Sequence, residues 1–404
     1  MINHIADKLD SKKARETLKS IVTETKLIYS PVFSKESDNE IYIKPENLQV
    51  TGSFKVRGAY NKISKLTNEE KSRGIITSSA GNHAQGVALS AQKLGIKATI
   101  VMPKTTPLLK INATKSYGAD VVLAGHVYDD AYKKAVRLQE EHGYTFVHAF
   151  DDLDVVEGQG TIALEILDQL ADLDCILVPV GGGGLISGVA VAAKRINPNI
   201  KIIGAEPTGA ASMLKALELN QCIPLDKVVT IADGCAVAKA GSMTYEIVKD
   251  YVDEIITISD EELMDAFLTL LENHKLISEN SGLLSLAASK KLNTKNKKVA
   301  CIISGGNIDV LSINMLINHG LVSRGRRFSF TLNVTDRPGE LTKITQILGQ
   351  ENANIIELSH DRYKGDNKFA DVEVEIAVIT ESHDHIERVT KAFQDNGYEI
   401  NRVI

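Results

Sequence analysis

The segment that decides the fold class is Cys175-Ile176-Leu177-Val178-Pro179-Val180-Gly181-Gly182-Gly183-Gly184-Leu185. Its apolar first half predicts a buried strand, and the glycines end that strand before a helical pattern begins. Backbone N–H groups at such a junction can converge on one phosphate because no Cβ obstructs them. No Lys-Ser or Lys-Thr pair follows, and no G-x-G-x-x-G with a downstream acid is present, which excludes nucleotide-triphosphate and dinucleotide loops. A purely structural turn is the alternative.

On both sides of this segment, between Gly74 and Leu316, short β-rich runs alternate with longer helical patterns. This alternation is typical of βαβ units, so the predicted fold class is α/β with parallel sheets. We expect strands at 74–77, 98–102, 120–123, 146–148, 175–180, 202–205 and 299–303.

The pattern changes near 322–327, where the polar and basic segment Val-Ser-Arg-Gly-Arg-Arg marks a domain boundary. A chain of 404 residues is expected to form two or three domains. We place one domain at 1–321 and a second at 327–404. The second has strand 328–334, helix 341–350, strands 355–361 and 370–379, helix 384–396 and a final short strand. This βαββαβ order predicts a ferredoxin-like sandwich.

A candidate nucleophile lies in Thr51-Gly52-Ser53-Phe54-Lys55-Val56-Arg57-Gly58. A lysine between a phenylalanine and a β-branched residue can be partly desolvated, which lowers its pKa and makes it reactive toward a carbonyl. Lys55 therefore suits a Schiff base. The alternative is a surface lysine in a turn.

Two further motifs lie at predicted strand ends, the edge where parallel sheets bind ligands. In Ser78-Ser79-Ala80-Gly81-Asn82-His83-Ala84-Gln85-Gly86, free N–H groups at a helix start can bind a carboxylate, and Asn82 adds a donor. His83 is either a general base or a packed or capping residue. In Cys301-Ile302-Ile303-Ser304-Gly305-Gly306-Asn307, Ser304 presents a hydroxyl, or is a helix N-cap.

Together, these motifs resemble the fold-type II pyridoxal-phosphate enzymes, and within them the threonine and serine dehydratases, over residues 26–321. The resemblance implies a two-lobed catalytic domain with a small lobe inserted at about 53–154, and pyridoxal 5'-phosphate as cofactor. It implies that Lys55 is both the cofactor's anchor and the catalytic base. The implied cofactor-binding residues are Phe54, Lys55, Asn82, Gly181, Gly182, Gly183, Gly184, Leu185, Glu279 and Ser304. The implied substrate-binding residues are Ser79, Ala80, Gly81, Asn82 and His83.

In this family Asn82 would contact the 3-hydroxyl of the cofactor, the glycine loop its phosphate, and Ser304 its pyridine nitrogen. A serine hydroxyl does not hold that nitrogen protonated as a carboxylate would, so the ring is a weaker electron sink. Loss of a β-hydroxyl is then favoured over a long-lived carbanion. The implied reaction converts threonine to 2-oxobutanoate and ammonia, and serine to pyruvate.

The sequence also bears on other functions that this fold supports. Sulfhydrylases and threonine synthases usually carry an aspartate after the lysine, where this chain has Val56. Serine racemases typically place a serine where Ala80 stands, so a racemase or serine dehydratase is the alternative of the same fold. A non-catalytic amino-acid-binding regulator would need a decayed lysine site.

Glu279 and Glu206 are two further acidic residues that the comparison with this family singles out. The family's Glu-Pro-Ser/Ala-Gly appears here as Ser278-Glu279-Asn280-Ser281-Gly282. Glu206 matches a position that coordinates a monovalent or divalent cation in some relatives, and a salt-bridged surface glutamate is the alternative.

The C-terminal segment, with Asp336-Arg337-Pro338-Gly339-Glu340-Leu341 after its first strand, resembles an ACT domain. The resemblance implies an allosteric amino-acid site at Gly339 and Asn354, contributed by paired subunits of a homodimer or homotetramer. Isoleucine is the leading candidate for this effector. A simple dimerisation module is the alternative.

Composition limits the remaining partners. The chain has a net charge of −6, and its sequence shows no cluster of basic residues that would form a basic stripe. Nucleic acid is therefore not an expected partner. We find no apolar run of membrane-spanning length and no signal-peptide pattern, and therefore expect a cytoplasmic protein without membrane partners. The cysteines Cys175, Cys222, Cys235 and Cys301 are widely spaced, which argues against a disulfide framework or a zinc site.

Overall fold

The computed structural model describes residues 5–361 and 371–403. The chain forms two compact units, Met1–Ile308 and Asp309–Ile404. The sequence analysis places the boundary at 322–327, after a helix that the structure assigns to the second unit. Within the described ranges, no helix combines the length and apolar character that a bilayer-spanning segment requires.

The larger sheet of the first unit has the strand order β1-β2-β10-β7-β8-β9. All its pairs are parallel except β1 with β2. Its strands are β1 (Ile28–Tyr29), β2 (Glu40–Pro45), β7 (Cys175–Pro179), β8 (Lys201–Pro207), β9 (Glu254–Ile258) and β10 (Lys298–Ile303).

Helices cover both faces of this sheet, as buried parallel strands require. On one face, apolar residues of α9, α10, α11 and α12 pack against β7, β8 and β10 in one core. On the other, α14 packs against β7, β8, β9 and β10, and α13 packs against α14. The helices of this lobe are α1 (Ser11–Leu18), α2 (Pro31–Ser37), α8 (Leu153–Gln159), α9 (Thr161–Gln169), α10 (Gly184–Ile196), α11 (Ser212–Leu219), α12 (Ser242–Tyr251), α13 (Asp260–His274) and α14 (Leu284–Ser289).

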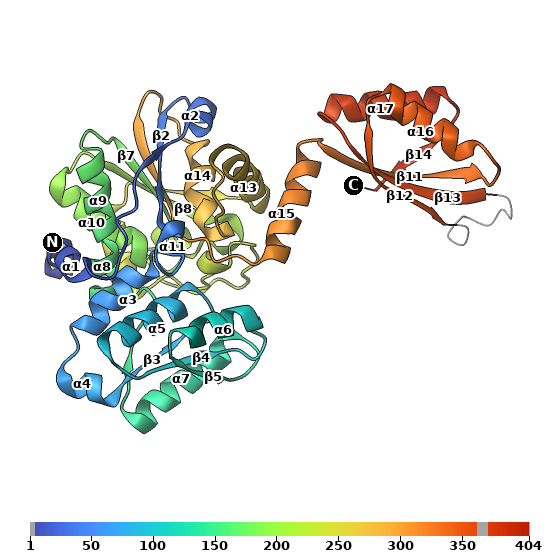
Figure 1. The fold of residues 1–404 in the computed structure, drawn as a ribbon. Helices are drawn as coiled ribbons and strands as arrows, with labels where there is room; N and C mark the ends of the chain where they lie inside the picture. Colours follow the sequence, from blue (N-terminus) through green and yellow to red (C-terminus); the bar gives the residue numbers. More distant parts are fainter. Residues whose placement is uncertain (1–4, 362–370, 404) are drawn as a thin grey trace. The chain divides into compact units, whose positions relative to one another are not determined.

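The smaller sheet has the order β5-β4-β3-β6 and is entirely parallel. Its strands are β3 (Ile75–Ser78), β4 (Ala98–Met102), β5 (Asp120–Leu123) and β6 (Thr145–Phe146). Its helices are α3 (Lys55–Ser64), α4 (Asn68–Arg73), α5 (Asn82–Leu94), α6 (Leu108–Ser116) and α7 (Tyr128–His142). Figure 1 shows α5 and α6 on one side of this sheet and α7 on the other. The α/β class with parallel sheets is thus confirmed.

Short 3₁₀ helices lie between these elements in the described part of the first unit: η1 (Ala6–Lys8), η2 (Glu46–Leu48), η3 (Thr208–Ala210), η4 (Asp233–Cys235) and η5 (Asn280–Leu283). Every strand expected in this unit is present, with ends shifted by at most a few residues. The sequence analysis missed β1, β2 and β9. Strand β2 enters the sheet beside β10, so its burial depends on a partner far along the chain.

The second unit opens with α15 (Val310–Ser323) and continues as an antiparallel sheet of order β12-β13-β11-β14. Apolar residues of β11, β13, α16 and α17 share one core. The elements are β11 (Arg327–Thr335), α16 (Glu340–Gln350), β12 (Asn354–Asp361), β13 (Asp371–Ile379), α17 (His383–Asp395) and β14 (Ile400–Arg402). The predicted βαββαβ order is confirmed.

Candidate active site

Lys55 opens α3 at a point where two distant loops pair. Phe54 N donates to Ser304 O at 3.1 Å, and Gly306 N donates to Gly52 O at 2.8 Å. The loop before α3 is therefore fixed to the loop that follows β10. This pairing brings the predicted lysine and the predicted serine into one site.

The Lys55 amine is held in an environment that favours its neutral form. Its Nζ donates to Ala149 O at 3.0 Å and lies 5.1 Å from the centroid of the Phe54 ring. It forms no ion pair with a carboxylate of the described residues. Burial lowers the pKa of Lys55 to about 8, although nearby Cys235 and Glu279 oppose that shift.

The glycine loop between β7 and α10 presents unused donors. In the described part of the chain, none of the backbone N–H groups from Gly181 to Ile186 donates to a protein acceptor. Gly183 has φ +96°, which a residue with a Cβ rarely adopts, and a Cβ at Gly182 would lie 2.4 Å from the Phe150 ring. The loop thus offers a run of free amides, and its conformation at Gly182 and Gly183 excludes a residue with a Cβ.

Neighbouring residues outside any predicted motif hold this loop in place. The Thr244 hydroxyl donates to Gly182 O at 2.6 Å, and Gly241 N donates to the same oxygen at 3.2 Å. The Asp151 carboxylate accepts from Ser242 N at 3.1 Å and from Met243 N at 3.0 Å, and so caps α12. The sequence analysis missed these residues because each acts through a partner far away in the sequence.

Three side chains form a hydrogen-bonded chain beside the Lys55 loop. Asn307 Nδ2 donates to Asn82 Oδ1 at 2.7 Å, and Asn82 Nδ2 donates to Glu279 Oε1 at 2.6 Å. Burial raises the pKa of Glu279 to about 7, although the Asn82 hydrogen bond opposes that shift. The altered segment after Glu279 is well anchored, because Asn280 Nδ2 donates to Ile231 O at 2.9 Å and Ser281 Oγ accepts from Cys235 N at 3.1 Å.

The start of α5 combines free amides with a packed histidine. The N–H groups of Ala80, Asn82, His83 and Ala84 donate to no acceptor among the described residues, while Gly81 N donates to Ser79 Oγ at 3.3 Å. His83 is 3% exposed, and its Nε2 lies 2.9 Å from Val147 O. Burial, reinforced by Lys55, lowers the pKa of His83 to about 3. A neutral His83 that donates to this carbonyl fits the packed alternative.

Ser304 is buried, and its hydroxyl makes no hydrogen bond in the described part of the chain. The N-cap alternative for Ser304 is wrong, because Asp309 caps the following helix α15. Among the described residues, the buried hydroxyls of Ser53 and Ser78 also have no partner, as do those of Thr106, Ser212 and Tyr245. Buried polar groups are usually hydrogen-bonded, so these hydroxyls are available to a ligand.

Glu206 is fully buried, so the alternative of a salt-bridged surface glutamate is wrong. Its two carboxylate oxygens accept from Met213 N and Leu214 N, each at 2.9 Å, near the start of α11. Burial raises the pKa of Glu206 to about 7, although these two hydrogen bonds oppose that shift. Among the described residues, no cluster of three His, Cys, Asp or Glu side chains could hold a metal ion. The cation stays a prediction.

In the second unit, Gly339 precedes α16 with φ +94°. Apart from Gly339 and its two chain neighbours, no described residue has an atom within 4 Å of the place a Cβ would take. Asn354 opens β12 and is exposed. Both positions are accessible to a small ligand, as the predicted effector site requires.

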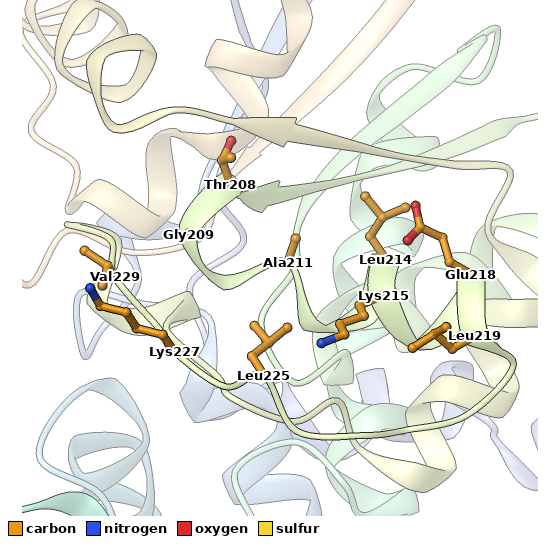
Figure 2. A pocket seen from close by; sticks show the side chains of 10 residues that line it. All are labelled: Thr208, Gly209, Ala211, Leu214, Lys215, Glu218, Leu219, Leu225, Lys227 and Val229. Carbon is orange, nitrogen blue, oxygen red and sulfur yellow. The ribbon is translucent and has the colours of Figure 1, made fainter.

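A cavity of about 660 Å³ lies on the larger lobe, between α11 and the segment that follows it. Figure 2 shows Lys215 and Lys227 on either side of Leu225 in this cavity. None of the predicted site residues lines it, so it is separate from the lysine site.

The residues around Lys55 fit pyridoxal phosphate. The free amides of the glycine loop suit a dianionic phosphate. The Lys55 amine, whose lowered pKa favours its neutral form, can react with the aldehyde. The free hydroxyl of Ser304 and the side-chain amide of Asn82 can hydrogen-bond to the polar atoms of the ring. The structure therefore offers a donor for each polar part of this cofactor.

Comparison with known proteins identifies the family. The model of the pyridoxal-phosphate dependent enzyme family matches residues 18–305. An L-threonine ammonia-lyase of Thermotoga maritima is 47% identical over 395 residues, which cover 98% of each chain.

Two solved structures have the same fold over most of the chain. Processed threonine deaminase isoform 2 from Solanum lycopersicum is 39% identical, with a TM-score of 0.73 over 78% of this chain and 90% of that one. Maize serine racemase is 36% identical, with a TM-score of 0.73 over 78% of this chain and 97% of that one. By sequence and by fold, this chain belongs to the pyridoxal-phosphate dependent enzyme family.

Proposed function

We propose that the protein is a threonine ammonia-lyase, which converts L-threonine to 2-oxobutanoate and ammonia. The observation that carries the proposal is the Lys55 amine, which has a pKa of about 8 and no carboxylate partner among the described residues. Such an amine can act as nucleophile and as base near neutral pH. The 47% identity to the L-threonine ammonia-lyase of Thermotoga maritima supports this choice of substrate.

Pyridoxal phosphate, when bound, supplies an aldehyde for amines and a conjugated ring that draws electrons from the substrate's α-carbon. The amides from Gly181 to Leu185 would hold its phosphate, and Lys55 would anchor its aldehyde. Asn82 and Ser304 would bind the polar atoms of its ring, with Glu279 and Phe54 beside them.

The chain's own residues would then carry the protons. The freed Lys55 amine would remove the α-proton of threonine, and hydroxide would leave from Cβ, so that the proton and the hydroxide together make one water. One water is consumed when the product hydrolyses to 2-oxobutanoate and ammonia. The water lost and the water consumed cancel, so the overall reaction is the loss of ammonia. Free N–H groups at the start of α5 would bind the substrate carboxylate, as helix N-termini do for anions.

Serine differs from threonine by one methyl group, so we propose it as a second substrate that yields pyruvate. A serine racemase is the second candidate, because the maize enzyme shares the fold at 36% identity. Racemisation needs a proton donor on the opposite face of the α-carbon, and Ala80 has no hydroxyl to serve there. We therefore expect little D-serine.

We further propose that the second unit is an ACT domain that binds an amino-acid effector at Gly339 and Asn354 in a homo-oligomer. Isoleucine is the leading candidate, since threonine deamination commits carbon to its synthesis. The βαββαβ order and the open surface at Gly339 support the proposal. A module that only dimerises the enzyme is the alternative.

The test is a steady-state assay of 2-oxoacid release from threonine and from serine, with and without isoleucine or valine. Chiral chromatography of the serine reaction measures D-serine in parallel. Assays in potassium, sodium and magnesium salts test the cation expected at Glu206. Release from neither substrate, with cofactor bound, would refute the proposed reaction.

A further inference from the structure

Asn307 lies at the end of the loop after β10 and uses its side-chain amide to join two other segments. Its Nδ2 donates to Thr51 O at 2.8 Å, in the loop before Lys55, and to Asn82 Oδ1 at 2.7 Å, at the start of α5. An amide nitrogen carries two hydrogens, so both are engaged. Gly52 leaves room for this side chain, because a Cβ there would lie 2.4 Å from Asn307 Oδ1.

This arrangement fixes which way the Asn82 amide points. Thr51 O is a backbone carbonyl and can only accept, so the atom of Asn307 that faces it must be Nδ2. The same Nδ2 faces Asn82, whose neighbouring atom must then be the acceptor Oδ1. Asn82 Nδ2 is therefore turned toward Glu279 Oε1, 2.6 Å away. One backbone carbonyl thus determines the orientation of two amides.

Glu279 alone would not impose this orientation. An ionised carboxylate accepts only, whereas a protonated one can also donate to an amide oxygen. Burial raises the pKa of Glu279 to about 7, so both forms exist near neutral pH. Asn307 is the partner that keeps the same orientation in either protonation state, since Thr51 O does not titrate.

We infer that Asn307 is a positioning residue that locks the Asn82 amide with its N–H groups toward the active site, so that Asn82 serves there only as a donor. One N–H of Asn82 is used by Glu279, and the second is left for an acceptor oxygen of the cofactor. The inference rests on the proposed function only for the last step, in which cofactor binding leads to threonine turnover.

The test uses the full-length protein and compares Asn307→Asp with the wild type. Aspartate matches asparagine in size but offers carboxylate oxygens where both N–H groups stood. Asn82 should then turn its Nδ2 toward the new carboxylate and its Oδ1 toward the site. We expect pyridoxal-phosphate affinity, measured by titrating the cofactor-free protein, to fall about 10-fold or more, because a ligand oxygen then faces an acceptor.

A double-mutant cycle separates this role from simple seating of the Thr51 loop. In an Asn82→Ala background, Asn307→Asp should weaken cofactor affinity by less than about 3-fold, because the amide it orients is gone. Equal fold-losses in both backgrounds would overturn the inference. Thermal unfolding of each cofactor-free variant verifies that the compared proteins are folded.

Asn199→Asp is the matched control, since Asn199 is exposed in a surface turn and the charge change is the same. It should leave cofactor affinity unchanged. A control variant that weakens affinity as much as Asn307→Asp would overturn the inference in favour of a nonspecific charge effect. Failure of the proposed function would appear instead in the wild type, as cofactor binding without 2-oxoacid release.

Discussion

Lys55 and Arg57, separated by Val56, lie in the first turn of α3, and their positive charges have opposite surroundings. Arg57 is fully buried, and its five N–H groups all have acceptors. Glu46 accepts from Nε at 2.8 Å and from Nη2 at 2.9 Å. Glu165 accepts from Nη1 at 2.6 Å and from Nη2 at 2.9 Å, and the Thr161 hydroxyl accepts from Nη1 at 3.1 Å. Lys55 has one carbonyl acceptor and no ion pair among the described residues.

The pKa shifts follow from these surroundings. Burial alone would lower the pKa of Arg57, but the carboxylates of Glu46 and Glu165 raise it above its ordinary value. Burial lowers the pKa of Lys55 to about 8, and no ion pair with a described residue reverses that shift. Lys44, whose Nζ donates to Glu165 at 2.6 Å, brings a second buried cation to balance the two carboxylates. Arg57, Lys44, Glu46 and Glu165 thus form a neutralised network, in which two buried cations balance two buried carboxylates. This network holds α3 in place, while Lys55, the first residue of the helix, remains reactive.

The largest expected effect comes from removing the reactive amine of Lys55. Lys55→Ala should reduce 2-oxoacid release by about 10,000-fold, because anchor and base are lost together. Lys55→Arg is the matched variant, since it keeps the charge but has a side chain that does not deprotonate in proteins. Both variants should lack turnover in the steady-state assay. Normal activity in either would contradict the role of a neutral Lys55 amine.

The next effect is on stability and comes from breaking the neutralised network. Arg57→Met should lower the free energy of unfolding of the first unit by about 3–5 kcal/mol, because Glu46 and Glu165 are left buried with only Lys44 to balance them. Chemical denaturation of the cofactor-free protein measures this change. Arg15→Met is the control, because the Arg15–Asp168 pair is solvent-exposed and should contribute less than about 1 kcal/mol. Equal losses in both variants would argue against the network.

The pH dependence of cofactor capture tests whether Lys55, unlike Arg57, reacts as a neutral amine. The reactive form of Lys55 is the neutral amine, whose fraction rises as pH increases through its pKa of about 8. Capture of pyridoxal phosphate by the cofactor-free protein should therefore accelerate between about pH 7 and 9 and then level off, whereas an ordinary lysine would continue to gain reactivity past about pH 10. Stopped-flow absorbance measures the rate. A midpoint near the ordinary lysine value would mean that Lys55 is not desolvated.

Much of the first unit could be predicted because its chemistry is carried by short local motifs. Asn82, the glycine loop and Ser304 follow the ends of β3, β7 and β10, where a parallel sheet gathers ligand-binding groups. Lys55 opens α3 beside the Ser304 loop. The supporting residues could not be predicted in this way. Glu46 and Glu165 bind Arg57 from other segments, and nothing in their local sequence distinguishes them from surface polar residues. Asn307 lies in a motif that the sequence singles out, but its partners Thr51 and Asn82 are far away in the sequence, so its positioning role could not be predicted. Their roles appear only when the fold brings those segments together.

The smallest expected effect concerns the second unit. An amino-acid effector should change substrate affinity by roughly 5- to 150-fold, the usual range of allosteric coupling. Asn354→Ala should remove most of this response, because it deletes an exposed amide that can donate to and accept from an amino acid. The measurement is a set of threonine saturation curves with and without isoleucine. Asn333→Ala is the control, since Asn333 is also exposed on a strand of the same sheet. If the wild type responds to no amino acid, or both variants respond as it does, the second unit serves assembly and the coupling proposed here is absent.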